Sequence, residues 1–133
     1  MADSFTSLMR ALVAAALLLA SATLMLVAVN TARAAGALAI GSCGAFGESY
    51  DFLTAAAARK TALAKCAGSA CRVVASVQRG CAALAVDYIN PCGPHGWGKA
   101  AELGRAQNAA LRACYEGGGK ECVVRTFFCD AKG

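Results

Sequence analysis

The chain has 133 residues, a formal net charge of +5 and a hydrophobic content of 58%. Its lysines and arginines are dispersed, with Arg59-Lys60 as the only adjacent pair, so they do not form the basic stripe typical of nucleic-acid-binding domains. We therefore expect no nucleic-acid partner, and the length limits the chain to one small domain with a modest core.

Residues 1–34 have the layout of a signal peptide, and we expect cleavage after Ala34. A short polar stretch ends at Arg10, an apolar run extends from Ala11 to Val29, and Ala32-Arg33-Ala34 offers the small residues that signal peptidase requires. The mature domain would then comprise residues 35–133 and be periplasmic or secreted. Because the apolar run approaches the roughly 20 residues that span a bilayer, an uncleaved anchor is the alternative, and it would be the only membrane contact.

All eight cysteines follow residue 34, and this density behind an export signal predicts a disulfide framework. The chain has no Cys-x-x-Cys motif, which disfavours a thioredoxin-like redox role. Only Cys66 and Cys71 approach a zinc-like spacing, and His95 is the only histidine, so we expect no metal and no cofactor.

The cysteine order indicates an internal duplication, with repeats over about residues 36–81 and 82–129. Cys43 lies 23 positions before Cys66, and Cys92 lies 22 positions before Cys114. In both halves a short glycine-containing loop leads to a third cysteine, an extended run and a fourth cysteine. Eight cysteines in the same order with nearly equal spacing are not expected by chance.

Each half predicts one helix between two strands. The first helix is capped by Thr54 and has a buried stripe of Ala58, Ala62, Leu63 and Cys66; the second has the matching stripe Ala106, Ala110, Leu111 and Cys114. Gln78-Arg79-Gly80 predicts a hairpin between the halves. The fold class is therefore α+β: a duplicated β-α-β unit that forms a four-stranded antiparallel sheet with both helices on one face, as in ferredoxin-like folds.

Several motifs of the mature region together resemble the DUF4189 family of small exported bacterial domains. They are Cys71-Arg72-Val73-Val74, the run Gly80 to Val86, Gly96-Trp97-Gly98, and a helix ending Ala110-Leu111-Arg112-Ala113-Cys114. The resemblance implies a cysteine-stapled α+β domain of unassigned activity and supplies no catalytic residues. The chain departs from the family pattern in having Cys43 and Cys92, and Lys99 in place of a helix-capping Thr or Ser.

A duplicated domain should pair its cysteines symmetrically, and we consider two such schemes. Cys66–Cys71 and Cys114–Cys122 are local in both. The first scheme, which we favour, joins Cys81–Cys129 and Cys43–Cys92 between the halves. The second joins Cys43–Cys81 and Cys92–Cys129 within each half.

Candidate functional residues lie where the two copies differ. The second copy has Asp87 to Pro91 where the first has only Gly41-Ser42. Loops on rigid scaffolds commonly carry function, and Trp and Tyr are enriched at binding hot spots. We expect Tyr88, His95 and Trp97 to form one partly exposed binding patch, held at its base by the disulfide of Cys92. Trp97→Ala should then weaken partner binding more than it lowers the melting temperature.

The residues give no support to catalysis, and we do not expect an enzyme. The acidic side chains after residue 34 are scattered singly, and no Gly-x-Ser-x-Gly motif occurs. The sequence therefore predicts an exported, disulfide-stabilised binding module with a protein or cell-envelope partner. The alternatives are a small envelope enzyme, hydrolase or thiol-redox, and an inhibitor or immunity-type protein.

Overall fold

The computed structural model describes residues 7, 9–21 and 35–130, in two units, Met1–Ala32 and Arg33–Gly133. In the first unit residues 9–21 are helical, with exposed apolar side chains such as Met9 and Leu18. The expected cleavage site at Ala32-Arg33-Ala34 lies outside the described residues. Within the described residues no helix has the length and apolar character needed to cross a bilayer.

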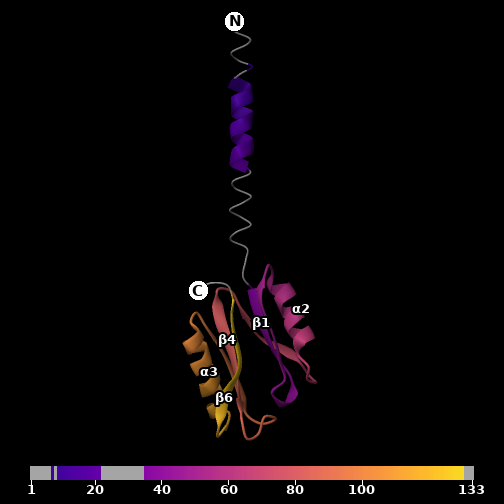
Figure 1. Cartoon of the computed structure of the whole chain (residues 1–133), viewed down its shortest axis with the longest axis vertical. Coiled ribbons are helices and arrows are strands. Elements are labelled where there is room, and N and C mark those ends of the chain that lie inside the picture. The colour runs from indigo at the N-terminus through magenta and orange to yellow at the C-terminus, as the bar shows by residue number, and fades with distance from the viewer. Residues whose placement is uncertain (1–6, 8, 22–34, 131–133) are drawn as a thin grey trace. The chain divides into compact units, whose positions relative to one another are not determined.

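The second unit contains the arrangement β-β-α-β twice (Figure 1). The first copy consists of β1 (Ala35–Ile40), the short 3-10 turn η1 (Ser42–Gly44), β2 (Phe46–Phe52), α2 (Ala55–Lys65) and β3 (Arg72–Val77). The second consists of β4 (Gly80–Asp87), β5 (His95–Ala100), α3 (Leu103–Glu116) and β6 (Cys122–Asp130). Each copy forms its own three-stranded antiparallel sheet, in the orders β2-β1-β3 and β5-β4-β6.

The two sheets pack face to face, and each helix covers the outer face of its own sheet (Figure 1). The core between the sheets contains Leu38 from β1, Leu84 from β4 and Phe128 from β6. Alanines of α2 and of α3 pack on the opposite faces of the two sheets. The α+β class is confirmed, but the prediction of one four-stranded sheet with both helices on one face is wrong.

The sequence pattern did not predict β2 and β5, because both strands contain glycines, which are typical of loops. These glycines face the helices, and a Cβ atom at Gly47 would lie 2.0 Å from the Ala62 carbonyl oxygen. At Gly96 it would lie 2.3 Å from the Cys114 nitrogen, and at Gly98 2.5 Å from the Ala109 Cβ. Glycine within a strand often marks such close approach of another backbone. The glycines that look like loop signals therefore allow each helix to rest directly on a strand.

The segment at Gln78-Arg79-Gly80 is not a hairpin, because β3 and β4 belong to different sheets. It is a sharp crossing in which Arg79 adopts a φ of 51°. The buried carboxylate of Asp130 supports this crossing by accepting hydrogen bonds from the backbone N–H groups of Arg79 (3.4 Å) and Asp51 (3.1 Å). The predicted hairpin was wrong because β3 pairs with β1, whereas β4 pairs with β5 and β6 on its two sides.

The helix predictions are confirmed except for one side chain. The Thr54 hydroxyl accepts a hydrogen bond from the Ala57 N–H at 3.2 Å and caps α2. Ala58, Ala62, Ala106, Ala110 and Cys114 of the predicted stripes are buried, and Cys66 is partly buried just after the end of α2. Leu63 is 41% exposed, so its assignment to the buried face was wrong.

The favoured disulfide scheme is confirmed: Cys43–Cys92, Cys66–Cys71, Cys81–Cys129 and Cys114–Cys122. The Cys81–Cys129 bridge does not join the two halves as expected. Cys81 lies on β4 and pairs directly with Cys129 on β6, so this bridge joins neighbouring strands of one sheet rather than the two halves. Cys43–Cys92 alone among the four bridges connects the two sheets.

We expect Gly96→Ala to lower the free energy of unfolding by about 1–3 kcal/mol, because its methyl group would overlap the backbone of α3. The matched control is Gly104→Ala within α3, where a Cβ atom meets nothing within 4 Å. This control should raise stability by about 0.5–1 kcal/mol through helix propensity. Chemical unfolding of the two variants measures both effects, and a Gly96→Ala protein as stable as the wild type would contradict the close helix contact.

Removing the bridge between the sheets should destabilise the fold more than removing a local one. Cys43–Cys92 closes a separation of 49 residues and Cys66–Cys71 one of only 5. Loop-closure entropy then predicts losses of about 4 kcal/mol for Cys43→Ser/Cys92→Ser and about 2 kcal/mol for Cys66→Ser/Cys71→Ser. Unfolding curves under non-reducing conditions give the comparison, and equal losses would show that the long bridge does not constrain the unfolded chain as proposed.

Candidate functional site

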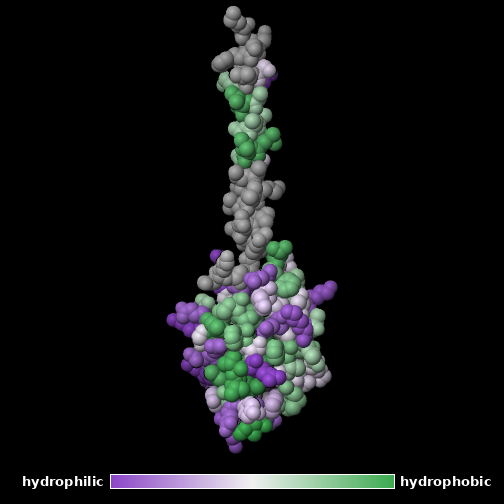
Figure 2. Space-filling model, in the orientation of Figure 1, coloured by the Kyte–Doolittle hydropathy of each residue, from purple (hydrophilic) through white to green (hydrophobic). Residues whose placement is uncertain are grey.

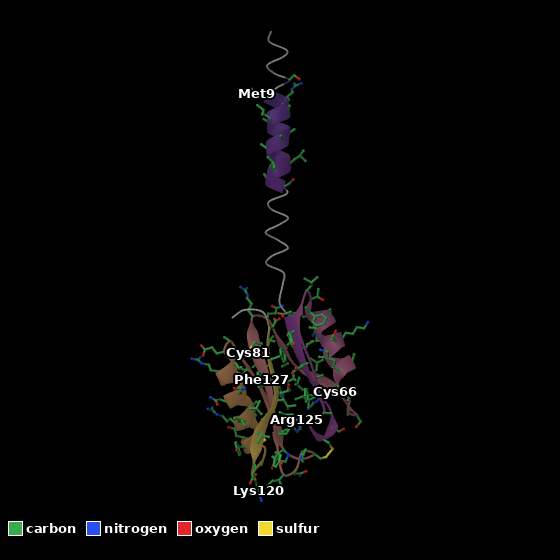
Figure 3. All side chains as sticks on the ribbon, viewed as in Figure 1. Met9, Cys66, Cys81, Lys120, Arg125 and Phe127 are labelled. Atoms are coloured by element: carbon green, nitrogen blue, oxygen red, sulfur yellow. A yellow bond between two sulfur atoms is a disulfide. The ribbon has the colours of Figure 1, made fainter. Side chains whose placement is uncertain are left out.

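The loop between β4 and β5, residues 88–94, is fixed by the side chain of Asp87 at the end of β4. One carboxylate oxygen accepts the N–H of Ile89 at 3.0 Å, and the other accepts the N–H of Lys120 at 3.0 Å. Lys120 lies just before β6, at the end of the domain marked in Figure 3. Asp87 thereby joins this loop to the loop between α3 and β6.

Asp87 is ionised at neutral pH. The Lys120 N–H is the main cause that lowers the pKa of this carboxyl below its usual range, and the Ile89 N–H adds to it, against the opposing effect of burial. A carboxylate that accepts several backbone N–H bonds is stabilised in its charged form. The charge on Asp87 is therefore part of what holds the loop in place.

Two further connections hold the loop, one covalent and one through the backbone. Cys92 is bonded to Cys43 of the turn η1, which brings a loop from the other sheet against this one. The Tyr88 N–H donates to the Glu121 carbonyl at 2.9 Å. The loop is thus tied to both sheets and is a fixed part of the surface.

The loop presents two large apolar side chains to solvent. Tyr88 is 70% exposed and Ile89 is 67% exposed, the highest values among the large hydrophobic residues described between residues 35 and 130. Exposed aromatic and aliphatic side chains on a fixed backbone lose little entropy when they bind. This is the arrangement expected of an anchor for another molecule.

His95 and Trp97 lie on one face of β5, and Tyr88 directly follows the end of β4. His95 and Trp97 project from the same face of β5, opposite Val86 and Leu84. The backbone N–H of Tyr88 donates to the Glu121 carbonyl, and a joint patch of Tyr88, His95 and Trp97 stays a prediction. In the part of the chain that the structure describes, no hydrogen bond or ring contact joins Tyr88 to His95 or Trp97.

Trp97 is 39% exposed and lies away from α3, because its neighbours Gly96 and Gly98 occupy the helix-facing side of β5. The His95 Nδ1 atom lies 3.3 Å from the Gly93 carbonyl oxygen of its own loop. His95 thus contacts a carbonyl of its own loop, and among the residues that the structure describes no carboxylate orients it as one orients a catalytic base.

A second exposed apolar surface lies on β6. Val123 and Phe127 are 42% and 50% exposed. Figure 2 shows apolar patches with polar surface between them on the face in view, and Figure 3 labels Phe127 and the charged Arg125 on this face. The pairing register with β4 shifts between Leu84 and Ala85, so that Arg125 is the extra residue of a bulge. A bulge and a charge on an edge strand discourage pairing with another chain. We therefore do not regard β6 as the candidate site.

The chemistry available at these surfaces is limited. All eight cysteines form disulfides, so no free thiol is present to act as a nucleophile. Within residues 7, 9–21 and 35–130, no three His, Cys, Asp or Glu side chains gather in a way that could hold a metal ion.

The sequence reading identified the loop but missed the residue that organises it. Asp87 is the only charged residue of the β4 run, and it comes directly before the inserted residues. An Asp at the start of a turn commonly accepts the N–H two residues later, as Asp87 does from Ile89. The bond from Ile89 could therefore be predicted from the local sequence. The bond from Lys120 could not, because it joins residues 33 positions apart.

Comparison with known proteins identifies a family but no individual relative. The model of a family described as a domain of unknown function, DUF4189, matches residues 35–129. No curated protein and no solved structure matches the chain.

We expect Asp87→Asn to lower stability at neutral pH and to lose this effect in acid. Folding lowers the pKa of Asp87, so the ionised group stabilises the fold above its unfolded pKa of about 3.9. This contribution is lost as the pH falls through the lower folded pKa. The difference in melting temperature between wild type and variant should therefore shrink below about pH 4.

Glu121→Gln is the matched control, since it removes a charge from the adjoining loop without removing a carboxylate that accepts these backbone bonds. Thermal unfolding between pH 2.5 and pH 7 makes the comparison. A pH-independent difference for Asp87→Asn would show that the carboxylate charge does not hold the loop.

Proposed function

The chain belongs to the DUF4189 family, and we propose that its domain is a periplasmic or secreted binding module that docks another cell-envelope protein through the β4–β5 loop. The observation that carries this proposal is the exposure of Tyr88 and Ile89 on a loop fixed by Asp87 and by Cys92.

Exposure and rigidity together favour a role in binding. Burying an exposed Ile or Tyr side chain yields about 1.5–3 kcal/mol. A loop that is already ordered avoids much of the entropy cost of association. A structural role does not explain Tyr88 and Ile89, because neither side chain contributes to the three buried clusters of the domain.

Two features support a location outside the cytoplasm. The four disulfides indicate an oxidising compartment. The signal-like composition of residues 1–34 agrees with export. We propose a non-catalytic role because every thiol is paired and because the single histidine is held by a backbone carbonyl. An inhibitor or immunity-type protein would be one form of such a module.

In-cell photocrosslinking tests the proposal at single positions. A photoreactive phenylalanine analogue replaces Tyr88 in the full-length protein, and irradiation of intact cells captures whatever contacts the loop. We expect one discrete crosslinked protein at this position. Adding Ile89→Ser should reduce its yield at least tenfold without changing the melting temperature, because Ile89 packs against nothing in the domain core.

The matched control places the same analogue at Leu53, which is 65% exposed in the connection between β2 and α2. This position should give no discrete product. Equal products at both positions, or none at position 88, would contradict docking through the loop.

A further inference from the structure

A pocket of about 320 Å³ lies at the edge of the sandwich formed by β3 and β5. It is lined by the end of β3, the crossing to β4 and the end of β5 with the residues after it: Ser76, Val77, Gln78, Arg79, Gly80, Lys99, Ala100 and Ala101. The volume is at the lower end of the range for ligand sites. It suits a group of a few heavy atoms.

The pocket exists because this edge lacks the side chains that fill the opposite edge. Leu38 of β1 and Leu84 of β4 are equivalent positions of the two repeats. The residues that pair with these strands then align β2 with β5 and β3 with β6. By this register Tyr50 corresponds to Lys99, and Phe128 corresponds to Val77.

At the edge formed by β2 and β6, the rings of Tyr50 and Phe128 stack with their centroids 6.2 Å apart. At the edge formed by β3 and β5 a lysine and a valine occupy the same two positions, and among the described residues no aromatic ring lines the pocket. The β3/β5 edge therefore has a positively charged cavity where the β2/β6 edge has an aromatic contact.

The lining contains two cations and no acidic residue. Lys99 and Arg79 are both exposed, and neither forms an ion pair with any residue that the structure describes. Glu102 and Asp130, which lie close to the lining residues in the sequence or through a hydrogen bond to Arg79, have other partners. Glu102 pairs with Arg105 at 3.5 Å, and the buried carboxylate of Asp130 accepts two backbone N–H groups.

We propose that this pocket binds a carboxylate carried on a short apolar stem, such as the end of a peptide or a small organic acid. Lys99 and Arg79 donate charge-assisted hydrogen bonds to the carboxylate, and Ser76 and Gln78 supply further polar groups. Val77, Ala100 and Ala101 contact the stem. This site is separate from the β4–β5 loop, and its occupancy does not depend on the docking proposed for that loop.

Trp97 provides a reporter beside the pocket. It is the only tryptophan of the chain, and it lies two residues from Lys99 on the same face of β5. Acetyl-Ala-Ala with a free carboxylate is titrated into the full-length protein while Trp97 fluorescence and backbone amide shifts are recorded. We expect saturable changes at Lys99, Arg79 and Ala101, and none with the C-terminal amide of the same peptide.

Lys99→Gln and Arg79→Gln should each weaken the affinity roughly tenfold, as expected for losing a hydrogen bond to a charged group. Arg112→Gln on the outer face of α3 is the charge-matched control and should bind normally. Titration with glutarate distinguishes the two possible ligands. Equal affinity for glutarate and the peptide would identify a small organic acid as the ligand, and tighter binding of the peptide would identify a peptide C-terminus.

Three results would overturn the proposal: equal binding of the amide, equal binding of inorganic phosphate, or an equal loss with Arg112→Gln. The amide spectrum of each variant confirms that the exposed substitutions leave the fold intact. Variants of Tyr88 and Ile89 should bind the peptide normally, so failure at this pocket and failure at the loop can be told apart.

Discussion

The fold depends on the direct contact between each helix and the glycines of one strand. Gly47 lies under the backbone of α2, and Gly96 and Gly98 lie under α3, with no room for a Cβ atom. Alanines on the helices complete these thin contacts. In each repeat the helix covers one face of the sheet. The other face carries apolar side chains, so it must be buried against another layer. The second repeat meets this need, since Leu38 and Leu84 are both fully buried between the sheets.

Two repeats packed face to face produce a nearly symmetric molecule, so the positions where they differ stand out. One difference is the loop after Asp87, which exposes Tyr88 and Ile89. The other is the edge at which Lys99 and Val77 replace a stacked pair of rings. The centre of the core uses equivalent leucines of the two repeats, Leu38 and Leu84. We therefore assign both proposed sites to the departures from symmetry.

Much of this could be predicted from the residues, and the errors share one cause. Cysteine spacing predicted the duplication and the pairing, and Thr54 predicted the start of α2, because these signals are local or follow from the repeat. The strands at Gly47 and Gly96 were missed because glycine signals a loop unless the helix above it is known. With two strands missing, one sheet appeared sufficient. The grouping of Tyr88 with His95 and Trp97 in one patch stays a prediction.

The correspondence between the two edges is the central claim, and rebuilding the missing ring pair tests it most directly. The variant Val77→Phe/Lys99→Tyr places at the β3/β5 edge the residues that stack at the β2/β6 edge. The measurement is its free energy of unfolding. The account predicts a value equal to or above that of the wild type, because the pocket of about 320 Å³ has room for both rings. A loss of about 1–3 kcal/mol, as overpacking produces, would contradict it.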